Sequence, residues 1–207
     1  MIRTIIFDLG GVVLTLDQQQ AVRRFEALGL KDAETRLDAY TQEGIFGDLE
    51  GGRISADTFR QELSKLVGHQ LTHEQCAYAW QGYARELPQR NLTALIRLRR
   101  AGYRLLLLSN TNPYMMEWVN SCNFDGHGNS ITYYFDAMYL SYEMHLMKPA
   151  EEIFRRVLMA EKKIPSECLF IDDGPHNVAV ASQVGINTFC PANGEDWTVR
   201  IYDYLNK

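Results

Sequence analysis

The chain has few cysteines and no long apolar run free of charge. Its four cysteines are scattered without a CxxC pair, so neither a zinc site nor a disulfide framework is expected, and free thiols are typical of a reducing compartment. No segment approaches the roughly 20 apolar residues of a membrane span. The N-terminus leads directly into an apolar segment without a charged leader. We therefore expect a cytoplasmic protein without a membrane partner.

Positive charge is not in excess either. The formal net charge is −5, which excludes the global basic field that holds nucleic acid. The 207 residues, 46% hydrophobic and 23% charged, suit one domain with a sizeable insert or two small domains. Internal repeats and low-complexity tracts are absent from the sequence. A phosphate-binding site in this chain would need a local positive charge or a metal ion.

Three short apolar runs each end in polar side chains: residues 5–7 before Asp8, residues 105–108 before Ser109 and Asn110, and residues 169–171 before Asp172 and Asp173. Runs of this length suit strands buried on both faces, and patterns of helical period lie between them. The alternation predicts an α/β fold with a doubly wound parallel sheet. Because ligands bind beyond the carboxyl ends of such strands, the polar clusters should meet at one edge.

Residues 17–87 contain no run of the buried-strand type. Amphipathic patterns fill this segment, and Ser55 and Thr72 stand where helix N-caps are expected. We therefore predict a helical cap over residues 17–87. It is inserted into an α/β core domain formed by residues 1–16 and 88–207.

The remaining elements are predicted from local patterns. Strands are expected at residues 2–7, 103–108, 137–140, 168–171 and 187–189, and helices at 91–100, 113–121, 149–162 and 178–184, before a terminal helix. Pro149 is assigned to the first turn of its helix, where its missing N–H carries no penalty. Within the cap, residues 43–52 are interpreted as a loop that can project toward the site and select substrates.

Asp8 is the candidate nucleophile. A carboxylate can attack phosphorus and divide a difficult hydrolysis into two easier steps through an aspartyl-phosphate. Asp172 and Asp173 repel each other unless a cation or a proton lies between them, and Mg²⁺ prefers one or two carboxylates with a substrate phosphate. The alternative for this pair is an Asx-turn at the end of a strand. Together with Asp8, the pair predicts a magnesium-dependent phosphoryl-transfer site.

Three further residues are candidates for binding phosphate. Ser109 and Asn110 can offer a hydroxyl and backbone N–H groups at a turn that enters a helix. Lys148 can offset the charge of the phosphate and the nucleophile together. The simpler interpretations are a helix cap for the first two and a solvated side chain for the lysine. We assign all three to substrate binding, and Ser109 and Lys148 also to catalysis.

Taken in order, Asp8, Ser109, Lys148 and the pair Asp172-Asp173 resemble the four motifs of the haloacid dehalogenase superfamily. The resemblance extends over nearly the whole chain. The spacing between the first two motifs is similar to that of the subfamily whose helical cap follows the first strand.

This resemblance implies a ligand set for Mg²⁺. Asp8 would be both nucleophile and metal ligand, and the backbone carbonyl of Gly10 would be the second ligand. Asp173 maps to the last carboxylate ligand, with Asp172 beside it as a further ligand or a support. Asn177 occupies the supporting position that follows.

Gly10 departs from the superfamily pattern, because most of its phosphatases have a second aspartate there as general acid and base. General acid catalysis typically contributes about 10²- to 10⁴-fold, so a substrate with a good leaving group is favoured unless another group donates the proton. A sugar 1-phosphate has such a leaving group, and the motif sequences resemble a branch that includes a glucose-1-phosphate phosphatase. His176 is one alternative donor, although a solvated loop histidine is the simpler interpretation.

We therefore expect a phosphoric monoester hydrolase that uses Mg²⁺ and an aspartyl-phosphate on a small phosphate ester, with a sugar 1-phosphate favoured. One alternative is a 2-haloacid dehalogenase, but a metal-free site would gain nothing from the facing carboxylates Asp172 and Asp173. A binding or regulatory protein that has lost catalysis is the other, and Gly10 is its only support. The sequence leaves the oligomeric state open.

Overall fold

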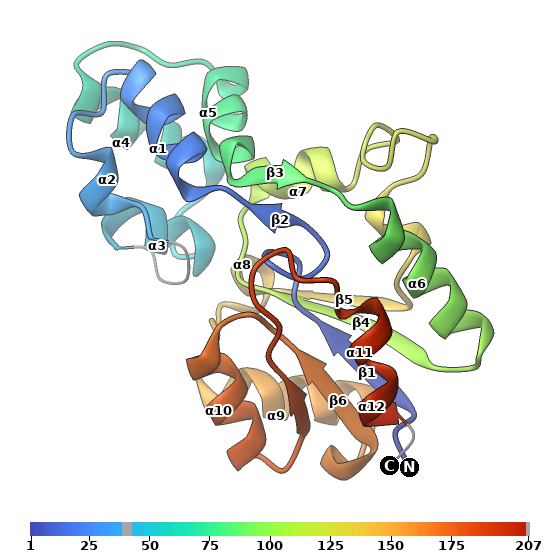
Figure 1. Ribbon diagram of the computed structural model, residues 1–207. Helices are drawn as coiled ribbons and strands as arrows, with labels where there is room; N and C mark the ends of the chain where they lie inside the picture. The colour runs from blue at the N-terminus through green and yellow to red at the C-terminus, as the bar shows by residue number, and fades with distance from the viewer. Residues whose placement is uncertain (39–42, 206–207) are drawn as a thin grey trace.

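The computed structural model describes residues 1–38 and 43–205. A five-stranded parallel sheet with the strand order β5-β4-β1-β6-β7 lies at its centre (Figure 1). The strands are β1 (Thr4–Phe7), β4 (Arg104–Ser109), β5 (Ala137–Leu140), β6 (Cys168–Ile171) and β7 (Asn187–Phe189). The predicted doubly wound α/β fold is confirmed, and β5, β6 and β7 have the predicted bounds.

The three apolar runs are neighbouring strands in matched register. Phe7 of β1 lies opposite Leu107 of β4 on one side and Ile171 of β6 on the other. β1 and β6 therefore end at the same level, and β4 continues for two residues beyond them to Ser109. The polar residues that follow them come to one edge of the sheet, as the sequence predicted.

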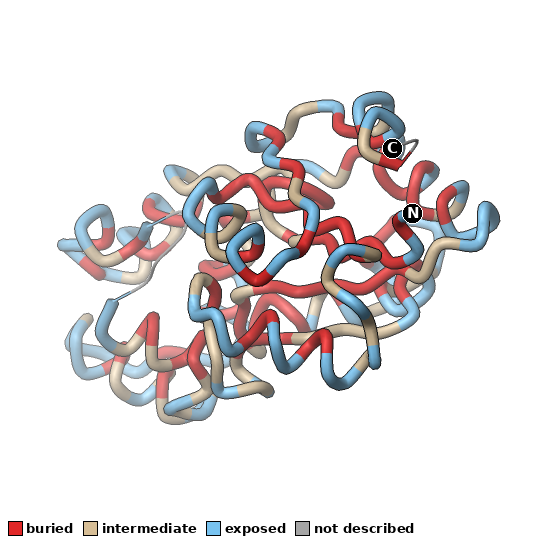
Figure 2. The backbone as a smooth tube through the Cα atoms, turned by 90° about the horizontal axis from the view of Figure 1, so that it is seen from below, coloured by how far each residue is buried: buried red, intermediate tan, exposed pale blue. Residues whose placement is uncertain are grey.

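Helices cover both faces of the sheet. One face packs against α9 (Glu151–Glu161) and α10 (Pro175–Gln183), and the other against α6 (Gln89–Arg100), α11 (Trp197–Arg200) and α12 (Tyr202–Leu205). Ile6 belongs to the first of these cores and Ile5 to the second. The strands are therefore buried on both faces, and Figure 2 shows buried backbone through the middle of the molecule. The short helices α7 (Pro113–Val119) and α8 (Ser141–Met144) follow β4 and β5.

Between β1 and α6 the chain forms a separate group of helices, residues 17–87, which we call the insert (Figure 1). Its helices are α1 (Gln18–Ala27), α2 (Ala33–Arg36), α3 (Gly44–Glu50), α4 (Ala56–Val67) and α5 (His73–Trp80). The chain leaves the core through β2 (Thr15–Leu16) and returns through β3 (Ala84–Glu86), and these two strands pair antiparallel. We propose that the insert is a domain, with this ribbon at its junction with the core.

Local sequence signals explain the ends of the longer insert helices. The hydroxyl of Ser55 accepts a hydrogen bond from the backbone N–H of Thr58, and Thr72 forms a capping box with Gln75. Both N-caps are where the sequence predicted them.

An aromatic cluster holds the insert together. The rings of Phe25, Phe46, Phe59 and Trp80 pack with centroid separations of 5.2 to 5.7 Å. Such ring pairs contribute about 0.5–1.5 kcal/mol each beyond the area that they bury. The cluster reaches the core at Tyr114 of α7, 5.9 Å from Phe59.

Three local predictions were wrong. Residues 43–52 are not a loop, because Gly44–Glu50 forms α3 and packs Phe46 into the aromatic cluster. Pro149 precedes the N-cap of α9 rather than opening the helix, and the Lys148–Pro149 peptide bond is cis. The terminal helix is divided into α11 and α12. Within residues 1–38 and 43–205, none of the helices is long and apolar enough to cross a membrane.

Candidate active site

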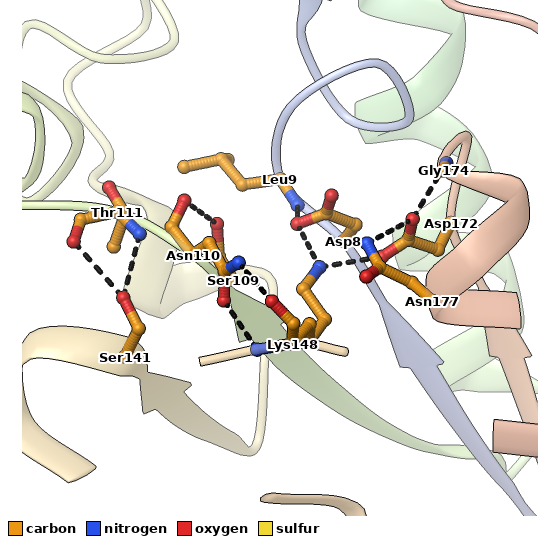
Figure 3. A network of polar contacts seen from close by, with 10 residues as sticks. All are labelled: Asp8, Leu9, Ser109, Asn110, Thr111, Ser141, Lys148, Asp172, Gly174 and Asn177. Carbon is orange, nitrogen blue, oxygen red and sulfur yellow. Dashed lines mark hydrogen bonds and ion pairs between the residues drawn. The ribbon is translucent and has the colours of Figure 1, made fainter. Parts of the chain in front are cut away.

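The residues predicted for the site lie at the carboxyl edge of β4, β1 and β6. Figure 3 shows five of them, Asp8, Ser109, Asn110, Lys148 and Asp172. Asp8 is the first residue after β1, Ser109 is the last residue of β4, and Asp173 is the second residue after β6. These three residues line one pocket with Asn110 and Lys148. The fold therefore brings together residues that are far apart in the sequence.

Lys148 connects the nucleophile candidate to the acidic pair. Its Nζ lies 2.9 Å from Asp8 Oδ1 and 2.6 Å from Asp172 Oδ2, and the residue is only 3% exposed (Figure 3). Burial alone would lower the pKa of Lys148, but the two carboxylates raise it above its ordinary value. The lysine is therefore a buried cation, and it can offset negative charge at Asp8 as the sequence predicted.

Asp8, Asp172 and Asp173 form a compact carboxylate cluster, with ligand atoms within 4.8 Å of one another. Burial raises the pKa of Asp8 to about 8 and that of Asp173 to about 6; neighbouring carboxylates add to both shifts, and Lys148 opposes them. Carboxyl groups that resist ionising together are stabilised by a cation between them. The all-oxygen donor set fits Mg²⁺.

Asp172 is already engaged in hydrogen bonds. Besides Lys148, it accepts from the backbone N–H of Gly174 at 2.8 Å and from Asn177 Nδ2 at 3.0 Å, both at Oδ1 (Figure 3). Asp173, in contrast, lines the pocket. This difference favours Asp173 as the metal ligand and Asp172 as the support that orients Lys148.

The loop after Asp8 passes directly against Asp173. Gly11 has a φ of +74°, and a Cβ atom there would lie 2.1 Å from Asp173 Oδ2. Trp197 Nε1 donates to the carbonyl of Val12 at 2.8 Å, and Asn91 Nδ2 donates to the same carbonyl at 3.0 Å. The loop is thus held in place from the core, and only glycine fits at position 11.

Gly10 is in a different situation. Its backbone lies outside the left-handed region, and an added Cβ would meet the side chain of Leu16, with 2.9 Å to Cδ1. Leu16 also lines the pocket. The space beside position 10 is therefore filled by an apolar side chain.

Asn110 holds the segment that carries Lys148. Its Nδ2 donates to the Lys148 carbonyl at 2.8 Å, and its Oδ1 accepts from the Lys148 backbone N–H at 2.9 Å (Figure 3). Ser109 is buried, and its hydroxyl donates to the Asn110 carbonyl at 3.3 Å. The Asn110 side chain is thus occupied in positioning Lys148, and its contact with substrate stays a prediction.

Among the described residues of the insert, Glu50, Trp80 and Tyr83 line the pocket. The two aromatic residues are buried, and they also line the pocket. Sequence analysis missed Glu50, which is 8% exposed. A local signal existed, because Glu50 lies between the apolar Leu49 and a glycine pair. His176, the alternative proton donor, is exposed and does not line the pocket.

Glu50 has an environment that favours its protonated form. Burial raises the pKa of Glu50 to about 7, although a hydrogen bond with Asn112 and the charge of Lys148 oppose this shift. At neutral pH this carboxyl group therefore exists in both its acid and its base form.

The end of α3 is attached to the core. The Ser141 hydroxyl donates to the Glu50 carbonyl at 2.6 Å and accepts from the Thr111 backbone N–H at 3.0 Å. Just beyond Glu50, a Cβ at Gly52 would lie 2.1 Å from the carbonyl oxygen of Tyr142, so the backbones are in close contact. The position of Glu50 thus depends on contacts with the segments after β4 and β5.

Comparison with known proteins identifies similar phosphatases. The family model of haloacid dehalogenase-like hydrolases matches residues 2–185. A D-ribitol-5-phosphate phosphatase from Bacteroides thetaiotaomicron is 45% identical over 206 residues, covering 100% of both chains. A haloacid dehalogenase-like hydrolase from Porphyromonas gingivalis is 43% identical with a TM-score of 0.95, covering 100% of this chain and 99% of that one.

Two further solved structures bear on the chemistry. A haloacid dehalogenase family enzyme from Bacteroides thetaiotaomicron, in complex with magnesium and inorganic phosphate, is 34% identical with a TM-score of 0.88; the match covers 97% of this chain and 99% of that one. An L-2-haloacid dehalogenase is 17% identical with a TM-score of 0.60, covering 100% and 99% of the two chains. The latter likeness extends to the fold alone.

Proposed function

The chain belongs to the haloacid dehalogenase-like hydrolases and is a phosphoric monoester hydrolase of that family; on this premise we propose that it removes phosphate from a small sugar or polyol phosphate. The observation that carries this proposal is the buried Lys148, ion-paired to Asp8 and Asp172 at one edge of the sheet. A dehalogenase would need no metal, so it would not use the cluster of three carboxylates.

We assign the first step of the reaction to Asp8. A carboxylate oxygen of Asp8 attacks phosphorus, the P–O bond to the leaving alcohol breaks, and an aspartyl-phosphate forms. Water then attacks the phosphorus of this intermediate and releases inorganic phosphate. Lys148 and Ser109 hold the phosphate oxygens, and Asp172 keeps Lys148 in place.

Mg²⁺ is the cofactor that we propose. Asp8, the Gly10 carbonyl and Asp173 would hold it, with Asp172 as support. When bound, the ion would supply positive charge to the phosphate oxygens and relieve the repulsion among the carboxylates.

The substrate proposal rests on the similar ribitol-phosphate phosphatase and on the residues that line the pocket. A phosphatase of D-ribitol 5-phosphate is 45% identical over its whole length, so the primary phosphate of an acyclic polyol is our first candidate. Gly10 supports a second candidate, a sugar 1-phosphate, because a better leaving group needs less help from an acid. Trp80, Tyr83 and Met115 line the pocket and would face the carbon chain of either substrate.

We propose the cytoplasm as the site of action. The four cysteines are free thiols, and Cys76 and Cys168 are buried. Unpaired thiols are typical of a reducing compartment.

The test is phosphate release from D-ribitol 5-phosphate, D-ribose 5-phosphate, glucose 1-phosphate and 4-nitrophenyl phosphate, with Mg²⁺ or with EDTA. We expect metal-dependent turnover that Asp8→Asn eliminates, because an amide does not form the acyl-phosphate. Asp203→Asn changes an exposed aspartate of α12 and serves as the matched control. Equal activity of Asp8→Asn and Asp203→Asn, or no release from any ester, would contradict the proposal.

A further inference from the structure

We propose that Glu50, at the end of α3 in the insert, is the general acid and base of this phosphatase. It would replace the carboxylate that position 10 lacks. This inference rests on the phosphatase function proposed above, and it assigns a catalytic role to a residue on the insert rather than on the sheet.

The first step is that no carboxylate of the Asp8 loop is available for proton transfer. Position 10 is glycine, and the side chain of Leu16 fills the adjoining space. A primary polyol phosphate has a poor leaving group, because its alkoxide must be protonated as the P–O bond breaks. Hydrolysis of such a substrate needs a donor from another part of the chain.

The second step is the count of acidic groups in the pocket. Among the described residues that line it, three have carboxylates: Asp8, Asp173 and Glu50. Asp8 pairs with Lys148, and Asp173 belongs to the cluster that would hold the metal. Glu50 lies outside that cluster, so it is the remaining carboxyl group in the pocket.

The third step is that Glu50 is held in place at its backbone carbonyl and at its carboxyl group. Its carbonyl accepts from the Ser141 hydroxyl at 2.6 Å, and its carboxyl group interacts with Asn112. Asn112 follows Ser109 in the segment after β4 and lines the same pocket. The carboxyl group is therefore held in the lining of the pocket that also contains Ser109 and Lys148.

Protonation is consistent with this role. Buried carboxyl groups resist ionisation, and Glu50 is buried without a direct ion pair among the described residues. An acid whose two forms are both populated near the working pH is the most effective proton shuttle.

The chemical step balances as follows. As Asp8 forms its bond to phosphorus, the protonated Glu50 gives its proton to the leaving oxygen, and the neutral alcohol departs. The Glu50 carboxylate then takes a proton from the water whose oxygen attacks the aspartyl-phosphate. The bond between Asp8 and phosphorus breaks, phosphate leaves, and both carboxyl groups return to their starting forms.

The experiment compares Glu50→Gln with Glu26→Gln, which changes an exposed glutamate of α1 in the same insert. Glutamine keeps the size of the side chain, but its amide has no acidic proton to transfer. For D-ribitol 5-phosphate we expect kcat to fall by about 10²- to 10⁴-fold in Glu50→Gln, with KM little changed, and no fall in Glu26→Gln.

A second substrate, 4-nitrophenyl phosphate, tests whether Glu50 acts by giving a proton to the leaving group. 4-Nitrophenolate leaves without a proton, so Glu50→Gln should still release one equivalent of it per enzyme in a rapid burst, followed by slow turnover. Glu50→Asp keeps a carboxyl group, so it should turn over the polyol phosphate faster than Glu50→Gln does. Its pH–rate profile should keep the limb that reports the acid, but at a different pH. This variant also serves if the glutamine protein does not fold.

The outcomes separate the two proposals. A rise in KM alone would make Glu50 a group that recognises substrate hydroxyls, and unchanged kinetics would make it structural; either result overturns the inference. Loss of the burst together with the turnover would also overturn it. If the parent protein releases no phosphate from any ester with Mg²⁺, it is the phosphatase proposal that fails.

Discussion

At the scale of single residues, Gly10 and Gly11 follow the same aspartate but meet different surroundings. A side chain at position 11 would need a φ of +74° and would lie 2.1 Å from Asp173 Oδ2. A side chain at position 10 would have to displace only Leu16. Position 11 is therefore restricted by the geometry of the site, whereas position 10 tolerates a small substitution.

Gly11→Ala should weaken magnesium binding by about 10- to 100-fold, the range usual for residues that orient metal ligands. Gly126→Ala is the matched control, because Gly126 has a φ of +73° and an added Cβ there meets nothing within 4 Å. Both variants carry similar backbone strain of about 1–2 kcal/mol, so their difference reports the contact with Asp173. Calorimetric titration with Mg²⁺ measures the affinity of each variant. Equal affinities in the two variants would count against the contact.

Gly10→Asp, introduced into the Glu50→Gln protein, should raise the turnover of D-ribitol 5-phosphate about tenfold above that of Glu50→Gln alone. This gain is a fraction of what a well-placed acid provides. The restored carboxyl group lies two residues after the nucleophile, and its fit requires Leu16 to move. Gly10→Asn in the same background has the same size without the proton. Equal rates for the two double variants would mean that the carboxyl group does not transfer a proton.

At the scale of elements, the sheet could be predicted and helix α3 could not. The strands β5 and β6 follow from short apolar runs bounded by polar residues, and the same rule brings Asp8, Ser109 and Asp173 to one edge. Helix α3 contains two glycines, Gly44 and Gly47, so its local propensity is low. It forms because the tertiary packing of the insert compensates for this weakness.

Glu50 was missed for a related reason. Its place in the pocket depends on how the end of α3 contacts the segments after β4 and β5. The local signal, a glutamate between Leu49 and a glycine pair, does not reveal such contacts between distant segments. The start of α9 was predicted too early, because Pro149 fits a first helical turn but belongs to the cis peptide before it.

Ser141→Ala should destabilise the protein by about 1–3 kcal/mol, because it leaves the Glu50 carbonyl and the Thr111 N–H without their buried partner. Ser182→Ala removes the hydroxyl of an exposed serine in α10, and we expect it to stay within about 0.5 kcal/mol of the parent. Urea unfolding of both variants gives the comparison. Identical midpoints would mean that the serine hydroxyl adds nothing to the attachment of α3.

At the scale of the whole molecule, the buried carboxyl groups of the candidate active site oppose folding at neutral pH. Burial raises the pKa of Asp8 to about 8, Glu50 to about 7 and Asp173 to about 6. In this range the folded protein binds more protons than the unfolded chain, whose carboxyl groups titrate near pH 4. Stability contributed by these groups is therefore present below about pH 4 and is lost as pH rises toward about 8.

The metal-free protein should accordingly have a higher melting temperature at pH 5.5 than at pH 8. Mg²⁺ binds the deprotonated carboxylates, so its stabilising effect should be larger at pH 8. At a free concentration of about 100 times Kd, we expect an increase of roughly 5–10 °C for a chain of this size. Thermal melting at both pH values, with Mg²⁺ or with EDTA, measures this. A metal effect that is equal at the two pH values would contradict the assignment of the buried carboxylates as ligands.

With Glu50 as the proposed acid, the hydrogen bond from Ser141 to Glu50 would link the timing of catalysis to the position of the insert. The proposed nucleophile belongs to the sheet and the proposed acid to the insert, so the two are together only while the insert is docked. A ligand that prevents docking would meet the nucleophile without the acid, and the bond to its alcohol would stay intact. Oversized polyol phosphates would then have a lower kcat as well as a higher KM. This selectivity would come from the insert rather than from the residues that bind the phosphate.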